Sequence, residues 1–190
     1  MTSSFRNHFS AHLSAIDRTV ADLEPVTSNA AAALAESLNN GGKVLTFGNG
    51  GSAAEAGHFA EELLGRYKKN RRPFAAISLT ADSNALTCIS NDFGYETILE
   101  RQLEAFVKPG DVAVALSTSG KSENVIRGLR TAKAKGAVTI ALTGESGLHG
   151  ADADYVIAVP STNSAIIQEV HLILIHYCCQ VVEDSVPEAQ

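Results

Sequence analysis

Five short apolar runs, separated by stretches of helical periodicity, constrain the fold of this chain more than any other feature. The runs predict buried strands at 43–47, 74–79, 111–116, 137–142 and 154–159. The stretches around them predict helices at about 52–66, 83–106 with an interruption at 91–94, 122–135, 147–152 and 164–183. Continuous apolar strands that alternate with helices are typical of a parallel sheet covered on both faces. We therefore expect one doubly wound α/β domain over residues 1–190, with a five-stranded parallel sheet.

The first forty residues predict helices of another kind. Apolar residues recur there at spacings of three and four, which indicates an amphipathic helix that ends near Pro25: Phe5, Phe9, Leu13, Ile16, Val20 and Leu23. A second helix covers 28–38 and stops at the Asn-Asn-Gly-Gly segment 39–42. We interpret residues 1–40 as a helical segment for packing and oligomerisation.

Composition excludes several classes of function. The 190 residues are 45% apolar, enough for a substantial core, and the net charge of −6 argues against nucleic acid or an anionic membrane as the main partner. No stretch approaches the roughly 20 apolar residues of a membrane span, and no signal peptide is visible, so we expect a cytoplasmic protein. The three cysteines, Cys88, Cys178 and Cys179, lack zinc-finger spacing and are expected to be buried free thiols.

A glycine-rich turn, GNGGS at 48–52, connects the first strand to a helix. Its glycines permit a sharp turn, and Ser52 stands where a helix N-cap is expected. A helix N-terminus with free N–H groups suits a phosphate or another anion. His58 and Glu62 follow four residues apart, so they share one face of this helix.

A second anion loop, STSGKS at 117–122, opens the helix that begins near Glu123. Four hydroxyls and backbone N–H groups at a helix start can surround a phosphate. A nucleotide P-loop is excluded, because the required glycine five residues before Gly120 is Ala115. A dinucleotide site is disfavoured, because the acidic residue expected about 20 positions after the first turn falls in the basic stretch 68–72.

Five motifs, in this order and spacing, resemble the sugar isomerase (SIS) family over nearly the whole chain: GNGGS at 48–52, HFAEELLGRY at 58–67, NDFGYE at 91–96, STSGKS at 117–122 and IQEVHLILIH at 167–176. Within that family the chain is most similar to the isomerases of sedoheptulose 7-phosphate. The resemblance implies a SIS fold, and a homotetramer with active sites at subunit interfaces. It also implies conversion of sedoheptulose 7-phosphate to D-glycero-D-manno-heptose 7-phosphate via an enediol, in heptose and lipopolysaccharide biosynthesis.

The resemblance also implies a role for each matching residue. Glu62 and His176 correspond to the acid/base pair. One zinc ion per subunit would be held by His58, Glu62, Gln168 and His176. Besides Glu62, the substrate would be bound by Asn49, Gly50, Gly51, Ser52, Asn91, Asp92, Ser117, Thr118, Ser119, Ser122 and Gln168.

The chemistry asks for the same residue types. An aldose–ketose isomerisation needs a base near C1 and C2 and a second group that exchanges protons with the oxygens. Gln168 and His176 are eight residues apart, about 12 Å along one helix. A single metal would have to lie between two stretched side chains, and a contribution from two subunits would relax this. We therefore expect the last helix to help form a shared active site.

Other residues receive plainer interpretations. His171 is expected to be structural or to support the site, the basic stretch 66–72 to be a solvated loop, and Asp82 to cap a helix. Ala165-Ile166 stands where many family members carry a polar residue or an arginine, which leaves the exact sugar open. Two alternatives remain: an isomerase of another sugar phosphate, and a non-catalytic SIS adaptor that binds the replication initiator. The presence of both Glu62 and His176 speaks against the adaptor.

Overall fold

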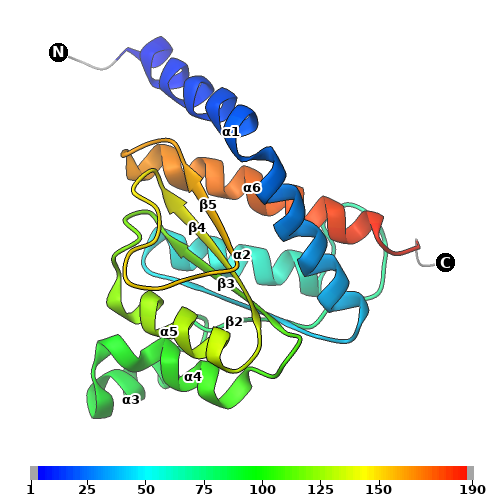
Figure 1. Ribbon diagram of the computed structural model, residues 1–190, viewed down its shortest axis with the longest axis vertical. Helices are drawn as coiled ribbons and strands as arrows, with labels where there is room; N and C mark the ends of the chain where they lie inside the picture. Colours follow the sequence, from blue (N-terminus) through cyan, green and yellow to red (C-terminus); the bar gives the residue numbers. More distant parts are fainter. Residues whose placement is uncertain (1–3, 188–190) are drawn as a thin grey trace.

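The five expected strands form one parallel sheet in the computed structural model, which describes residues 4–187 (Figure 1). The strands are β1 (Val44–Gly48), β2 (Ala76–Ser78), β3 (Val112–Ser117), β4 (Val138–Gly144) and β5 (Tyr155–Val159). Their order is β2-β1-β3-β4-β5, so the chain moves to one side after β1 and to the other side after β2. The loops after β1 and β3 therefore meet at a topological switch point, where ligands bind in open α/β sheets.

Helices cover both faces of the sheet, as expected for a doubly wound fold (Figure 1). Alternate strand residues divide between two cores: Val112, Val114 and Leu116 face one side, and Ala113 and Ala115 face the other. The first core packs against α1 (Phe5–Asn39), α2 (Gly51–Leu64) and α6 (Ser164–Asp184). The second packs against α4 (Ile98–Phe106) and α5 (Glu123–Ala134), while α3 (Ser83–Phe93) and the 3-10 turn η1 (Tyr95–Thr97) precede α4.

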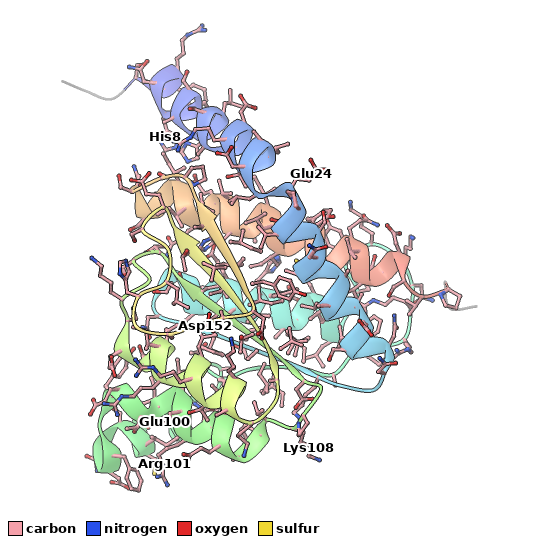
Figure 2. All side chains as sticks on the ribbon, viewed as in Figure 1. His8, Glu24, Glu100, Arg101, Lys108 and Asp152 are labelled. Atoms are coloured by element: carbon pink, nitrogen blue, oxygen red, sulfur yellow. The ribbon has the colours of Figure 1, made fainter. Side chains whose placement is uncertain are left out.

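The N-terminal segment is one helix rather than two. α1 continues through Pro25, so the expected break there is wrong. The ribbon changes direction beside Glu24 (Figure 2), because a proline inside a helix removes one hydrogen bond and kinks the helix without ending it. Residues after the kink, such as Leu34 and Leu38, are buried, whereas Phe5 and Phe9 before it are exposed. Residues 1–3 of the predicted 1–40 segment lie outside the described residues.

Three local expectations have different outcomes. The prediction of a short helix at 147–152 is wrong. The segment is a loop, in which Gly147 and Gly150 have φ values of 70° and 71°. Ser52 is not the N-cap of α2, because the cap is Gly50, and Ser52 is buried inside the first turn. The cap assigned to Asp82 is confirmed, since its carboxylate accepts hydrogen bonds from the N–H groups of Asn84 and Ala85.

α6 is apolar and contains two of the three cysteines. By length and composition it could cross a membrane, contrary to the sequence expectation, but half of its most apolar window is buried and it packs against α1 and α2. Such burial is typical of a core helix. Cys178 and Cys179 are buried free thiols, and burial raises the pKa of Cys178 to about 12. Cys88 is free but exposed, so the expectation of burial is wrong for this residue.

Candidate active site

The two anion loops meet at the switch point and enclose a small polar pocket. Its volume is about 90 Å³, and both loops and the start of α6 supply its walls. The pocket brings together all five hydroxyl residues of the two loops. It is lined by Asn49, Ser52, Leu116, Ser117, Thr118, Ser119, Ser122 and Gln168. The N-termini of α2 and α5 both begin at these loops, which adds two favourable helix dipoles for an anion.

Glycines allow these loops to approach one another. A Cβ atom on Gly51 would lie 2.4 Å from Nε2 of Gln168, so only glycine lets the Gln168 side chain reach the turn. Gly120, with φ of 62°, is even more restricted, because a Cβ there would lie 1.9 Å from the carbonyl oxygen of Gly147. The conformation of the second anion loop, residues 117–122, therefore depends on Gly120.

Asn49 is held by two residues to which sequence reasoning gave no role. Its Oδ1 accepts hydrogen bonds from the Tyr95 hydroxyl and from Asn124 Nδ2, both at 2.8 Å, and its Nδ2 donates to Asn124 Oδ1 at 2.9 Å. Tyr95 belongs to the quoted NDFGYE motif, which was the available signal. Asn91 and Asp92 of that motif hydrogen-bond to each other at the exposed end of α3 and are not among the pocket-lining residues.

A second group of predicted residues meets beyond the pocket, between α2 and α6. Nε2 of His58 lies 3.0 Å from Nε2 of His176 and 3.5 Å from Oε1 of Glu62. One ligand atom from each of the three residues lies within 4.8 Å of the others. The proposed acid/base pair therefore comes together within one chain, and a second subunit is not needed to unite it.

The proton on His58 is positioned by Glu61. Nδ1 of His58 lies 3.0 Å from a Glu61 carboxylate oxygen, which favours the N–H at Nδ1 and leaves a lone pair on Nε2. That lone pair converges with the Glu62 carboxylate and the second imidazole, a donor set that fits a zinc ion. Gln168 instead lines the small polar pocket between the two anion loops, called the serine pocket below, and contacts Gly51. Its role as a fourth zinc ligand therefore stays a prediction.

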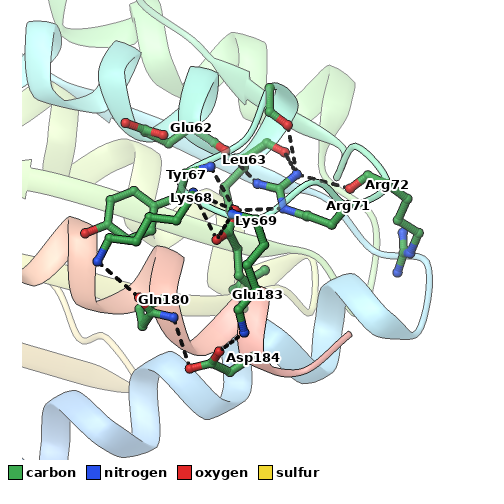
Figure 3. A network of polar contacts seen from close by, with 12 residues as sticks. Glu62, Leu63, Tyr67, Lys68, Lys69, Arg71, Arg72, Gln180, Glu183 and Asp184 are labelled. Carbon is green, nitrogen blue, oxygen red and sulfur yellow. Dashed lines mark hydrogen bonds and ion pairs between the residues drawn. The ribbon is translucent and has the colours of Figure 1, made fainter. Parts of the chain in front are cut away.

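The C-terminal end of α2 is fixed by a buried arginine (Figure 3). Arg71 donates hydrogen bonds to the carbonyl oxygens of Glu62, Leu63 and Gly65 at 2.7–3.1 Å, and its side chain is 1% exposed. These carbonyls are the ones that a helix terminus leaves without partners, and a cation there is favoured by the helix dipole. The expectation of a solvated loop at 66–72 is therefore wrong for Arg71.

Glu183 of α6 is the partner of this loop. Its carboxylate lies 3.4 Å from Nε of Arg71 and accepts hydrogen bonds from the N–H groups of Tyr67, Lys68 and Lys69 (Figure 3). Burial alone would raise the pKa of Glu183, but the three N–H donors and Arg71 outweigh burial and lower the pKa. The loop is thus attached to α6 by a charged side chain that is fully buried.

The attachment of this loop to α6 supports the group of His58, Glu62 and His176, called the acid/base cluster below. The Tyr67 ring, whose backbone is held by Glu183, stacks on the His176 imidazole with centroids 5.2 Å apart. Arg71 holds the backbone of Glu62 at the other side of the cluster. Both proposed catalytic residues therefore touch groups that the Arg71–Glu183 pair orders.

Two other titratable groups lie in the same layer. Glu55, three residues before His58 on α2, is half-buried, and burial raises its pKa from 4.5 to about 7. His171 is fully buried, and burial lowers its pKa to about 4 despite a 3.1 Å hydrogen bond from Nε2 to the Thr143 carbonyl oxygen. A neutral, buried histidine of this kind agrees with the structural role expected for His171.

Comparison with known proteins first gives the class. A family model described as SIS domain matches residues 6–144, which contain both anion loops, His58 and Glu62. The fold and the paired loops at the switch point are thus those of a SIS domain.

Individual relatives narrow the class. The phosphoheptose isomerase of Aquifex aeolicus is 55% identical over 156 residues, which cover 82% of each chain. The phosphoheptose isomerase of Aliarcobacter butzleri is 42% identical over 97% of this chain and 98% of its own length. The solved structure of a phosphoheptose isomerase from Francisella tularensis superimposes with a TM-score of 0.89 at 35% identity, covering 94% of this chain and 96% of that one. The chain therefore belongs to the phosphoheptose isomerase family of SIS-domain proteins.

Proposed function

We propose that this protein converts sedoheptulose 7-phosphate to D-glycero-D-manno-heptose 7-phosphate through an enediol, as a step in heptose and lipopolysaccharide biosynthesis. One observation carries the proposal: the same two helices, α2 and α6, line the serine pocket near their starts and the acid/base cluster further along. Ser52 and His58 are six positions apart, and Gln168 and His176 are eight positions apart, about 9 and 12 Å along the helices. An extended seven-carbon sugar phosphate can bridge such a separation, with its phosphate in the pocket and C1 and C2 at the cluster.

The serine pocket would bind the phosphate. Its hydroxyls can each donate a hydrogen bond, and the starts of α2 and α5 contribute N–H groups and positive dipole ends. Asn49, held rigidly by Tyr95 and Asn124, would contact the sugar chain between the pocket and the cluster. The phosphate thereby fixes which carbons reach the acid/base pair.

Glu62 and His176 would move the protons. The Glu62 carboxylate takes the proton from the carbon beside the carbonyl and returns it to the neighbouring carbon. His176 exchanges a proton with the substrate oxygens, and its ring is kept in place by Tyr67. Both groups are partly buried, which limits the access of water to the enediol.

We further propose that His58, Glu62 and His176 hold one zinc ion per subunit, with Gln168 as a fourth ligand. When bound, zinc supplies a Lewis acid that polarises the substrate carbonyl. The convergent donors described above are the observation that supports this assignment.

We also propose that the working form is a cytoplasmic homotetramer with its active sites near subunit interfaces. Phe5, Phe9 and Leu13 of α1 and Ile173 of α6 are exposed, and an apolar cavity of about 250 Å³ lies between these helices. Apolar surface of this extent is typical of interfaces, and soluble homo-oligomers usually close symmetrically. The charge of −6 argues against nucleic acid or an anionic membrane as a further partner.

The test is to incubate the purified, zinc-supplemented protein with sedoheptulose 7-phosphate and to follow aldose formation by NMR. We expect aldose resonances to grow, and pentose and hexose phosphates to react far more slowly. Faster conversion of a pentose or hexose phosphate would reject the assigned sugar. If no sugar phosphate were converted, the enzyme assignment would be wrong and the adaptor alternative would stand.

A further inference from the structure

A second cluster of metal-ligating side chains lies between α1 and α6, apart from the acid/base cluster. His8 and His12 are four residues apart on α1, and Glu169 stands in the first two turns of α6. One ligand atom from each lies within 4.8 Å of the others. Figure 2 labels His8 on the part of α1 before the kink. The proposed isomerisation uses none of these three residues.

His12 has the orientation of a metal ligand. Its Nδ1 lies 2.7 Å from the carbonyl oxygen of His8, so Nδ1 carries the N–H and Nε2 presents its lone pair. Nε2 is shielded from solvent and contacts Oε2 of Glu169. A lone pair that faces a carboxylate oxygen needs a cation between the two, which is either a proton on Nε2 or a metal ion.

The position of His8 favours the metal ion. Residues i and i+4 share a helix face, and the two imidazole rings lie with centroids 4.5 Å apart. A simple ion pair between His12 and Glu169 needs no third group, whereas two histidines and one glutamate form a recurrent zinc ligand set with an open fourth position. With bonds of about 2.0–2.1 Å, tetrahedral ligand atoms lie about 3.4 Å apart, which small side-chain rotations achieve here.

We propose that His8, His12 and Glu169 form a second zinc-binding site that attaches the first half of α1 to α6. This half has little other support: Ala15 and Thr19 are its only buried residues among those described before Pro25. One further polar contact joins it to the body, from Arg18 Nη1 to the Pro160 carbonyl oxygen at 3.1 Å. Within one subunit, a metal ion at the cluster would therefore order a half-helix that has few buried residues of its own.

The experiment compares the zinc content of full-length variants after dialysis against buffered zinc. One variant is His8→Gln with His12→Gln, a second is His58→Gln with His176→Gln, and the control is His149→Gln, an exposed histidine outside both clusters. We expect the His8/His12 variant to hold one zinc ion fewer per chain than the parent and the control to hold the same number. The His8/His12 variant should keep its isomerase activity, which separates this proposal from the proposed function.

A second measurement distinguishes loss of the zinc site from loss of folding in the His8/His12 variant, because it leaves His8 and His12 in place. In the His58/His176 background, added zinc should still raise the melting temperature and shift the ring resonances of His12. An unchanged zinc content in the His8/His12 variant would overturn the proposal. So would a His58/His176 variant that binds no zinc at all. Either result would identify the His12–Glu169 contact as an ion pair only.

Discussion

The buried pair of Arg71 and Glu183 gives the sharpest stability prediction. Glu183→Gln keeps the shape of the side chain but removes its charge, and it turns an NH₂ group toward the backbone donors of Tyr67, Lys68 and Lys69. The Arg71 guanidinium, 1% exposed, then loses its only ion-pair partner among the described residues. Breaking a buried pair in this way costs about 3–5 kcal/mol, and we expect the free energy of unfolding to fall by that amount.

The next residue of α6 supplies a matched control. Asp184 forms an ion pair with Lys69, but these side chains are 54% and 41% exposed. Solvent screens such a pair, so Asp184→Asn should destabilise the protein far less than Glu183→Gln. Urea unfolding followed by circular dichroism measures both variants. If Glu183→Gln destabilised the protein no more than Asp184→Asn, the buried pair would not be what attaches the loop to α6. Folding lowers the pKa of Glu183, so stability should also depend on pH. The contribution of Glu183 to the free energy of unfolding should be lost as pH falls below about 4.5.

Three further predictions follow from the site. Ser119→Ala with Ser122→Ala should raise KM with little change in turnover, because hydrogen bonds to a charged group contribute about 1.5–3 kcal/mol each; an unaltered KM would move the phosphate elsewhere. The folded state raises the pKa of Glu55 from 4.5 to about 7. The contribution of Glu55 to the free energy of unfolding should therefore be complete below pH 4.5 and be lost as pH rises to 7. Urea titrations at several pH values should show this fall in the parent, and Glu55→Gln should abolish it. Mixed oligomers of Glu62→Gln and His176→Gln chains should stay inactive, because the structure unites the pair within one chain; recovered activity after proven subunit exchange would refute this.

The sheet and the anion loops could be predicted because their signals are local. Buried parallel strands show as continuous apolar runs, and the loops at 48–52 and 117–122 carry their glycines and hydroxyls within five or six residues. His58 and Glu62 share a helix face, which spacing alone reveals. Gln168 and His176 stand eight positions apart on one helix. The structure places Gln168 in the pocket, and its role as a zinc ligand stays a prediction.

The remaining features depend on contacts between distant segments. Arg71 stands in a run of basic residues that is typical of a solvated loop, and its partner Glu183 lies on the last helix. Tyr95 of η1 and Asn124 of α5 gain their roles only because the fold brings both side chains to Asn49, in the turn after β1. Pro25 predicts a helix end from local cost, about 3 kcal/mol, but the burial of Ala30, Leu34 and Leu38 beyond it maintains one continuous helix. Local propensity was overridden there by packing.

The central claim, that Glu62 is the base of a sugar-phosphate isomerisation, is tested most directly by the turnover of Glu62→Gln on sedoheptulose 7-phosphate. A positioned base contributes about 10²–10⁴-fold, so turnover should fall at least about 100-fold. The circular dichroism spectrum and the urea midpoint should stay close to those of the parent, because the Glu62 contact that orders the loop is its backbone oxygen. Glu104→Gln, an exposed change on α4, controls for loss of charge alone. A folded Glu62→Gln protein with parental turnover would contradict the account.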